Sequence, residues 1–305
     1  DFIGHGGVLD DDPHELLGFW NCDDIPGGDD PNDPNNCSNR NFLDFARPLN
    51  PGGLAGLWVA ENTRDEIWTG LHSGESFGTS GTRMRIRTVA SWDPLPADIC
   101  DQLASGRDLI AGQIVSNGAV MGSDLPAKPA GADAPYFAAY AIQDPDGAPL
   151  QSLDMIKAYV NDNGEAKNRA YNGIATTSQP VRRPSSATCQ IPLDGHPATL
   201  CTTWRDPDFN ADKDAMWYAR ALEVPSCRWS DYLCGVNAED SDGNSITVNC
   251  AELDPSNGVF PESSGQQGYE GCCEITESNG VFTGQKRFSP IEERAWASPI
   301  WYEVD

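Results

Sequence analysis

Gly53-Leu-Ala-Gly-Leu-Trp-Val-Ala-Glu-Asn-Thr-Arg64 is the stretch that decides the fold of this 305-residue chain. Its apolar part, Leu54 to Ala60, has the length and continuity of a buried strand. A helix is predicted to follow at once, because Thr63 and Glu66 have the spacing of a capping box and Gly74 supplies a stop. With a second strand expected at Ser76–Thr88, the stretch predicts one α/β unit.

Beyond this unit the sequence changes to short β-branched or alternating runs separated by turns rich in Asp, Asn and Gly. The strand candidates are Tyr136–Ile142, Met155–Val160, Thr199–Trp204, Ala215–Leu222 and Ile300–Val304. Their spacing predicts an antiparallel β-sandwich. We therefore expect an α+β, β-rich chain.

The cysteines predict an oxidised protein. There are 10, an even number, with no Cys-x-x-Cys pair, which favours disulfides over a zinc site. Proximity favours the pairs Cys22–Cys37 and Cys189–Cys201. One cysteine of a remaining group is then expected to pair with Cys100 and the others among themselves; the group is Cys227, Cys234, Cys250, Cys272 and Cys273. Disulfides of this kind indicate a periplasmic, extracellular or cell-surface location.

The net charge of the chain limits the kinds of molecule that it can bind. A formal net charge of −26, with only 20 basic residues, excludes a nucleic-acid partner. Repulsion at this level favours a salty medium or bound cations, for which calcium is the candidate. No apolar run reaches the ~20 residues of a membrane-spanning helix, and no signal peptide is present, so we expect either that one was removed or that the chain is a processed fragment.

Two polar segments stand out. Residues 21–41 form an acidic loop of Asp, Asn, Pro and Gly, for which a solvated loop is favoured over a calcium site because EF-hand spacing is lacking. Residues 235–290 are rich in Gly, Asn and Ser and contain cysteines, which predicts a disulfide-tied insertion.

Several further motifs occur in one order along the chain. They are Glu61–Arg64, Thr79–Arg87, Met121–Leu125, Asp144–Leu150, Trp204–Phe209, Tyr218–Glu223 and Glu293–Tyr302. Taken together, this series resembles the C-terminal half of the domain-of-unknown-function 3604 family, relatives of the polymerase and histidinol phosphatase (PHP) type metallohydrolases.

The resemblance implies an architecture and an activity. Residues 1–90 would be the remnant of a PHP-like α/β barrel, and residues 91–305 a β-sandwich domain. Such barrels hold divalent metals through an early His-x-His pair, carboxylates and a late Asp-x-His element, and no His-x-His pair occurs in this chain. The chain is therefore expected to be the C-terminal portion of an exported metal-dependent hydrolase of phosphoesters or related esters, inactive without the metal-binding portion.

If the chain is such a portion, we expect it to bind the missing N-terminal portion, another protein chain or a second copy of itself. The alternative is a non-catalytic secreted protein that assembles into a surface layer, a filament or a larger complex. Acidic charge, cysteines and the lack of a complete active site suit this alternative as well.

Candidate site residues are few. Glu61, Asn62 and Arg64 would lie at the C-terminal end of a barrel strand, where barrel active sites gather, although helix capping and an ion pair are the favoured roles. Weak candidates for metal ligands are His5, His14, Asp240, Asp242 and Asn244.

Two charged series have structural interpretations. Arg83, Arg85 and Arg87 alternate and so share a face, where pairing with nearby acids is favoured over an anionic substrate. The alternating acids from Asp206 to Asp214 lack EF-hand features, and a structural turn is favoured there.

Overall fold

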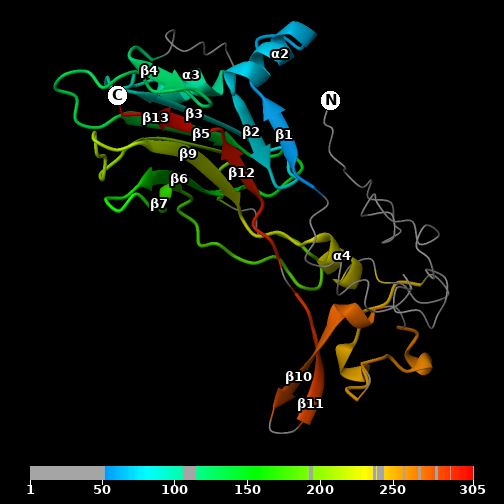
Figure 1. The fold of residues 1–305 in the computed structure, drawn as a ribbon. Coiled ribbons are helices and arrows are strands. Elements are labelled where there is room, and N and C mark those ends of the chain that lie inside the picture. The colour runs from blue at the N-terminus through cyan, green and yellow to red at the C-terminus, as the bar shows by residue number, and fades with distance from the viewer. Residues whose placement is uncertain are drawn as a thin grey trace.

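The computed structural model describes residues 52–105, 115–191, 195–235, 238, 244–256, 258–266, 269–278, 281–288 and 290–304. Two antiparallel sheets lie face to face, and a small hairpin projects beyond one end of them (Figure 1). The β-rich, antiparallel prediction is thus confirmed. Within these residues no helix is long and apolar enough to cross a membrane.

The larger sheet has seven strands in the order β1-β2-β12-β9-β6-β7, with β13 also paired to β9. Their bounds are β1 Leu54–Leu57, β2 Ser76–Thr79, β12 Arg294–Ala297, β9 Ala215–Glu223, β6 Leu150–Val160, β7 Ala166–Thr176 and β13 Ile300–Tyr302. The smaller sheet has the order β4-β3-β5-β8, with bounds β4 Gly118–Val120, β3 Arg85–Ser91, β5 Tyr136–Ile142 and β8 Thr199–Arg205.

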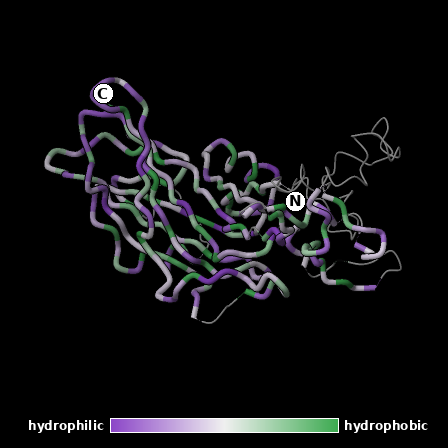
Figure 2. Tube along the Cα trace, turned by 90° about the horizontal axis from the view of Figure 1, so that it is seen from below, coloured by the Kyte–Doolittle hydropathy of each residue, from purple (hydrophilic) through white to green (hydrophobic). Residues whose placement is uncertain are grey.

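The core lies between the two sheets because alternate side chains of each strand point inward. Along β9, Trp217, Ala219 and Ala221 are fully buried, whereas the residues between them are only partly buried. Phe137 of the facing sheet contacts Trp217 with ring centroids 5.2 Å apart. Figure 2 shows the corresponding mixture of hydrophobic and hydrophilic residues along the strands.

The predicted α/β unit is only partly right. Helix α2 spans Arg64–Ser73, with the Thr63 side chain accepting from the Glu66 amide and Gly74 in the left-handed conformation, as the capping signals predict. Strands β1 and β2, however, pair antiparallel, whereas barrel strands run parallel. β2 also pairs with β12, so this unit is an edge of the sandwich; the part of the predicted domain before Gly52 lies outside the described residues.

Two strand predictions in this region are wrong. The run from Leu54 to Ala60 was expected to be a buried strand, but β1 ends at Leu57 and is only partly buried, because it forms an edge of the sheet. The expected single strand Ser76–Thr88 is divided at residues 80–84 into β2 and β3, which belong to different sheets.

Four disulfides join the eight cysteines of the described residues: Cys100–Cys201, Cys189–Cys227, Cys234–Cys272 and Cys250–Cys273. The predicted Cys189–Cys201 bridge is wrong, as is the predicted pairing of Cys100 with one of the group from Cys227 to Cys273, because Cys100 pairs with Cys201. Because Leu200 of β8 faces the core, Cys201 faces the opposite side, where helix α3 (Ile99–Ala104) carries Cys100. Cys22 and Cys37 lie outside the described residues.

Residues 228–288, called the insertion here, leave the sandwich after β9 and return before β12. Within its described residues are α4 (Trp229–Gly235), the short 3-10 helices η2 (Cys250–Glu252), η3 (Glu262–Ser264) and η4 (Glu270–Cys272), and the hairpin β10 (Cys273–Ser278) and β11 (Val281–Lys286). The hairpin points away from the sandwich (Figure 1).

Candidate functional site

The candidate catalytic residues lie on the surface between β1 and α2. Glu61 and Asn62 are exposed in the turn between β1 and α2, and Arg64 is exposed at the first position of α2. The structure gives their side chains no hydrogen bond or ion pair with another described residue. Thr63 performs the capping role; Asn62 lines the apolar cleft described below, and Arg64 lines a second hollow beside Trp68 and Leu71.

Only one of the candidate metal ligands lies within the described residues. His5, His14, Asp240 and Asp242 lie outside the described residues, and Asn244 is exposed. Among the described residues, no group of three His, Cys, Asp or Glu side chains could hold a metal ion. The part of the chain that the structure describes therefore does not fit the divalent metals that the family resemblance implies.

The acidic series from Asp206 is a structural turn, as predicted. Asp206, buried at 3% exposure, binds the Lys157 ammonium with Nζ and Oδ2 2.7 Å apart and accepts from the Trp217 indole at 3.2 Å. Asp208 pairs with Arg169 and accepts from the Tyr171 hydroxyl at 2.8 Å. These carboxylates are occupied by protein donors and hold the turn against the sheet.

The arginine series is likewise paired with acids at two of its three positions. Arg87 is buried beside Glu75 with a 3.1 Å contact, and its guanidinium lies 4.8 Å from the Trp58 ring centre. Arg83 binds Asp144 and Asp146. The prediction that these side chains neutralise nearby acids is confirmed for Arg83 and Arg87.

A group of buried acids at one end of the sandwich was not predicted as a site. Burial, together with the negative charges of Glu293 and Asp144, raises the pKa of Glu223 to about 8. Glu223 is 1% exposed, and its Oε1 has no hydrogen-bond partner among the described residues. Burial also raises the pKa of Glu293.

Asp144 behaves differently although it lies nearby. Its burial raises the pKa, but the Arg83 and Asp146 amides and the Arg83 guanidinium outweigh this, and the net pKa is lowered. The donors around Asp144 therefore separate its lowered pKa from the raised pKa values of Glu223 and Glu293. Each of these acids belongs to one of the ordered motifs, which is the signal that could have found the group.

An apolar cleft of about 530 Å³ lies beside β1 and the start of α2. Its apolar lining comes from Leu54, Leu57, Val59, Phe77 and Met84, among others. On the neighbouring helix, Ile67, Trp68 and Leu71 are 37%, 64% and 57% exposed. Cleft and helix together form an exposed apolar region, which we call the β1/α2 surface.

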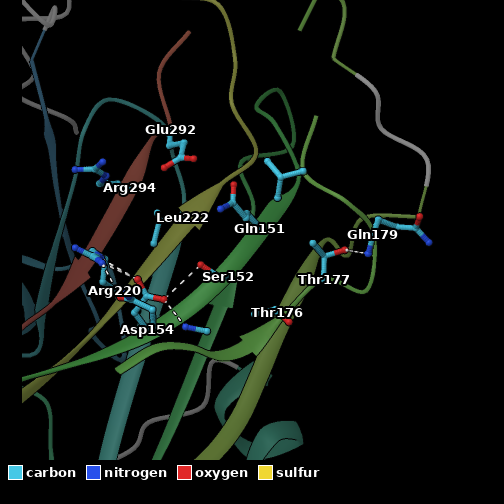
Figure 3. A pocket seen from close by; sticks show the side chains of 13 residues that line it. Gln151, Ser152, Asp154, Thr176, Thr177, Gln179, Arg220, Leu222, Glu292 and Arg294 are labelled. Atoms are coloured by element: carbon cyan, nitrogen blue, oxygen red, sulfur yellow. Dashed lines mark hydrogen bonds and ion pairs between the residues drawn. The ribbon is translucent and has the colours of Figure 1, made fainter. Parts of the chain in front are cut away.

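A polar pocket of about 510 Å³ lies on the outer face of the larger sheet, where β6, β7, β9 and β12 contribute side chains (Figure 3). Its floor is the ion pair of Asp154 and Arg220, with Nη2 and Oδ2 2.7 Å apart. The side chains that surround this ion pair in Figure 3 include Gln151, Glu292 and Arg294. Sequence patterns gave no indication of this pocket, because its residues are far apart along the chain.

Comparison with known proteins gives one match. The family model described as "Protein of unknown function (DUF3604)" matches residues 28–249, which is more than half of the chain. No curated protein and no solved structure matches the chain. The resemblance inferred from the ordered motifs is thereby confirmed: the chain belongs to the DUF3604 family.

Proposed function

We propose that the described part of this chain is a non-catalytic, docking portion of an exported metal-dependent hydrolase of phosphoesters or related esters. In this proposal the metal and the reacting groups belong to a separate catalytic portion. The β1/α2 surface binds that portion. The observation that carries the proposal is the exposure of Trp68 and Leu71 on one helix beside an apolar cleft.

The energetics favour coverage of this surface. Fully burying an apolar side chain of this size contributes about 1.5–3 kcal/mol, so Ile67, Trp68 and Leu71 together offer several kcal/mol to a partner. β1 is also the terminal strand of its sheet, and an edge strand can pair with another strand. Clustered apolar exposure of this kind marks an interaction surface.

The first test concerns the origin of the partner. The precursor transcript should encode His-x-His and Asp-x-His elements upstream of Asp1. A signal peptide directly before Asp1 would defeat the proposal that the catalytic portion is encoded with this chain.

The second test concerns the surface. The upstream product, produced separately with an affinity tag, should retain the 305-residue chain, and the double variant Trp68→Lys/Leu71→Lys should lose most of this retention. Val281→Lys is the matched control, because Val281 is 61% exposed in the hairpin, away from the β1/α2 surface. Equal retention of the double variant and the control would place the docking surface elsewhere.

The third test concerns catalysis. The 305-residue chain alone should not hydrolyse p-nitrophenyl phosphate, bis-p-nitrophenyl phosphate or p-nitrophenyl acetate with added Mn²⁺ or Zn²⁺. Turnover by the purified chain would overturn the proposal, provided that it copurifies with the chain through two different separations.

A second candidate, a secreted structural protein that assembles with itself, is favoured by one observation. The hairpin β10–β11 exposes Ile275, Val281 and Phe282 at 40%, 61% and 51%. Light scattering over a range of concentrations distinguishes the two: assembly that Phe282→Ser abolishes supports the structural protein, and a monomer at every concentration removes it.

A further inference from the structure

The polar pocket in Figure 3 is built by two register shifts, one in the ladder of strand β6 with β9 and one in its ladder with β7. In its pairing with β9, the register shifts between Leu150 and Ser152, which leaves Gln151 as an extra residue. In its pairing with β7, the register shifts between Leu153 and Met155, opposite residues 172–174. A bulge re-aims side chains, and bulges are concentrated near functional sites.

The first bulge changes which residues face outward. Without it, Leu150, Ser152 and Asp154 would point to the same side of the sheet. With it, Leu150 is buried in the core, while Ser152 and Asp154 line the pocket on the outer face. Gln151 lines the pocket next to them.

The second bulge fixes the floor of the pocket. Gly173 has a φ of 65°, and its amide donates to Asp154 Oδ1 at 2.8 Å. Asp154 Oδ2 accepts from Arg220 Nε at 3.1 Å and Nη2 at 2.7 Å. Asp154 is 3% exposed and satisfied by these donors, so it holds the Arg220 guanidinium in place at the base of the pocket.

The walls of the pocket contain polar groups for which the described residues supply no hydrogen-bond partner. Gln151 Oε1 is a buried acceptor without a hydrogen-bond partner among the described residues, which costs about 1–3 kcal/mol unless a donor reaches it. The Arg294 guanidinium and the Glu292 carboxylate line the pocket, and the structure gives neither a hydrogen bond nor an ion pair with another described residue. Thr176, Thr177 and Gln179 add hydroxyl and amide groups.

The charges in the pocket balance. Asp154 neutralises Arg220, and the second cation of the lining, Arg294, is matched in number by one anion, Glu292. With a net charge of −26, the whole chain repels an anionic ligand. The chemistry that matches separate donors and acceptors, without a net charge, is a set of neighbouring hydroxyl groups, each of which both donates and accepts.

An aromatic side chain lies next to one of the lining residues, outside the lining itself. Trp296 of β12 is paired directly with Arg220 across the ladder, so its partly buried ring shares the outer face with Arg220. A ring of this size offers a flat apolar area next to the hydrogen-bonding groups. The volume of about 510 Å³ is within the range of pockets for small molecules.

We propose that this pocket is a binding site for a neutral saccharide, whose hydroxyl groups bind Arg294, Glu292 and Gln151 while a sugar ring lies against Trp296. The site is separate from the β1/α2 surface. It does not depend on the docking role proposed above.

The test is binding of the 305-residue chain to an array of neutral and uronic-acid oligosaccharides, followed by titration calorimetry with the neutral oligosaccharide that gives the strongest signal. Arg294→Gln and Glu292→Gln should each weaken binding about tenfold, because each removes a charge-assisted hydrogen bond. Arg183→Gln, at an exposed arginine outside the pocket, is the matched control and should bind like the wild type. Circular dichroism of each variant verifies that it is folded.

Three outcomes would overturn the proposal. One is the absence of binding to every neutral oligosaccharide of the array. Another is binding confined to the uronic-acid oligosaccharides. The third is a neutral ligand whose affinity is the same for folded Arg294→Gln, folded Glu292→Gln and the control.

Discussion

The sandwich and the insertion are stabilised by different means. The main core of the sandwich is a cluster of 22 buried residues, from Met84 to Tyr302, with no cysteine among those described. The corresponding cluster of the insertion has eight described residues, and half of them are Cys234, Cys250, Cys272 and Cys273. A short segment cannot bury enough apolar surface to fold, and covalent links replace the missing core.

The largest expected effect follows from removing the links of the insertion. Its bridges Cys234–Cys272 and Cys250–Cys273 close loops with separations of 38 and 23 residues, and each should contribute about 3–4 kcal/mol. In the variant with all four cysteines changed to serine, we expect chymotrypsin to cleave within residues 228–288 rapidly while the sandwich stays intact. Mass spectrometry of the fragments over time measures this.

Changing Cys100 and Cys201 together to serine is the counterpart in the sandwich. This bridge ties α3 to the outer face of the smaller sheet, beside the main core. The variant should lose stability but remain a folded sandwich. Equal cleavage of both regions in the two variants would contradict the comparison.

The next effect tests a buried ion pair in the sandwich. Lys157→Met leaves the Asp206 carboxylate, whose side chain is 0% exposed, without its counter-charge, which should cost about 3–5 kcal/mol. Urea denaturation followed by tryptophan fluorescence measures the loss. Lys167→Met, at a lysine that is 48% exposed beside Glu165, should cost less than about 1 kcal/mol.

A double variant sharpens this result. Asp206→Asn retains polar atoms for the Trp217 indole and removes the unpaired charge, so Lys157→Met/Asp206→Asn should recover part of the stability. If the double variant is less stable than Lys157→Met alone, the uncompensated charge is not the cause of the loss.

The elements that sequence patterns predict are those with local causes. The cap at Thr63, the stop at Gly74 and the strands β5, β8 and β9 depend on residues a few positions apart. The disulfide partners and the antiparallel pairing of β1 with β2 depend on the tertiary arrangement. Cys201 lies near Cys189 in the sequence but faces α3, which no local pattern records.

The same distinction applies to the candidate sites. Pairing of Arg87 with an acid could be predicted from the excess of carboxylates, and the turn at Asp206 from its motif. The pocket could not, because it depends on where Gln151 interrupts the ladder with β9, and one extra residue in a strand leaves no mark in the hydrophobic pattern. The buried acids around Glu223 come together only when both sheets have formed.

A smaller effect concerns Glu223, again in the sandwich. Its pKa is raised to about 8 in the folded chain, against an ordinary value of 4.5, so between these pH values the folded state holds a proton that the unfolded state releases. Stability should therefore fall as the pH rises from about 4.5 to about 8 and then level off. Glu223→Gln should lack this loss and be more stable than the wild type at pH 9, by about 5 kcal/mol at most.

Guanidinium denaturation at pH 5 and pH 9 measures this difference. Glu262→Gln, at an exposed position in the insertion, should follow the wild type at both pH values. A Glu223→Gln variant with the same fall in stability as the wild type would show that another group causes it.

The smallest effect returns to the insertion and the origin of its stability. Phe282 is 51% exposed on the hairpin, so Phe282→Ala removes a side chain that contributes little to any core and should change the unfolding free energy by less than about 0.5 kcal/mol. Phe137→Ala removes the same atoms from a fully buried position in the sandwich and should cost about 3–5 kcal/mol. Thermal unfolding under oxidising conditions measures both. If Phe282→Ala were as costly as Phe137→Ala, the aromatic side chains of the insertion would be part of a core, and its disulfides would supplement apolar packing instead of replacing it.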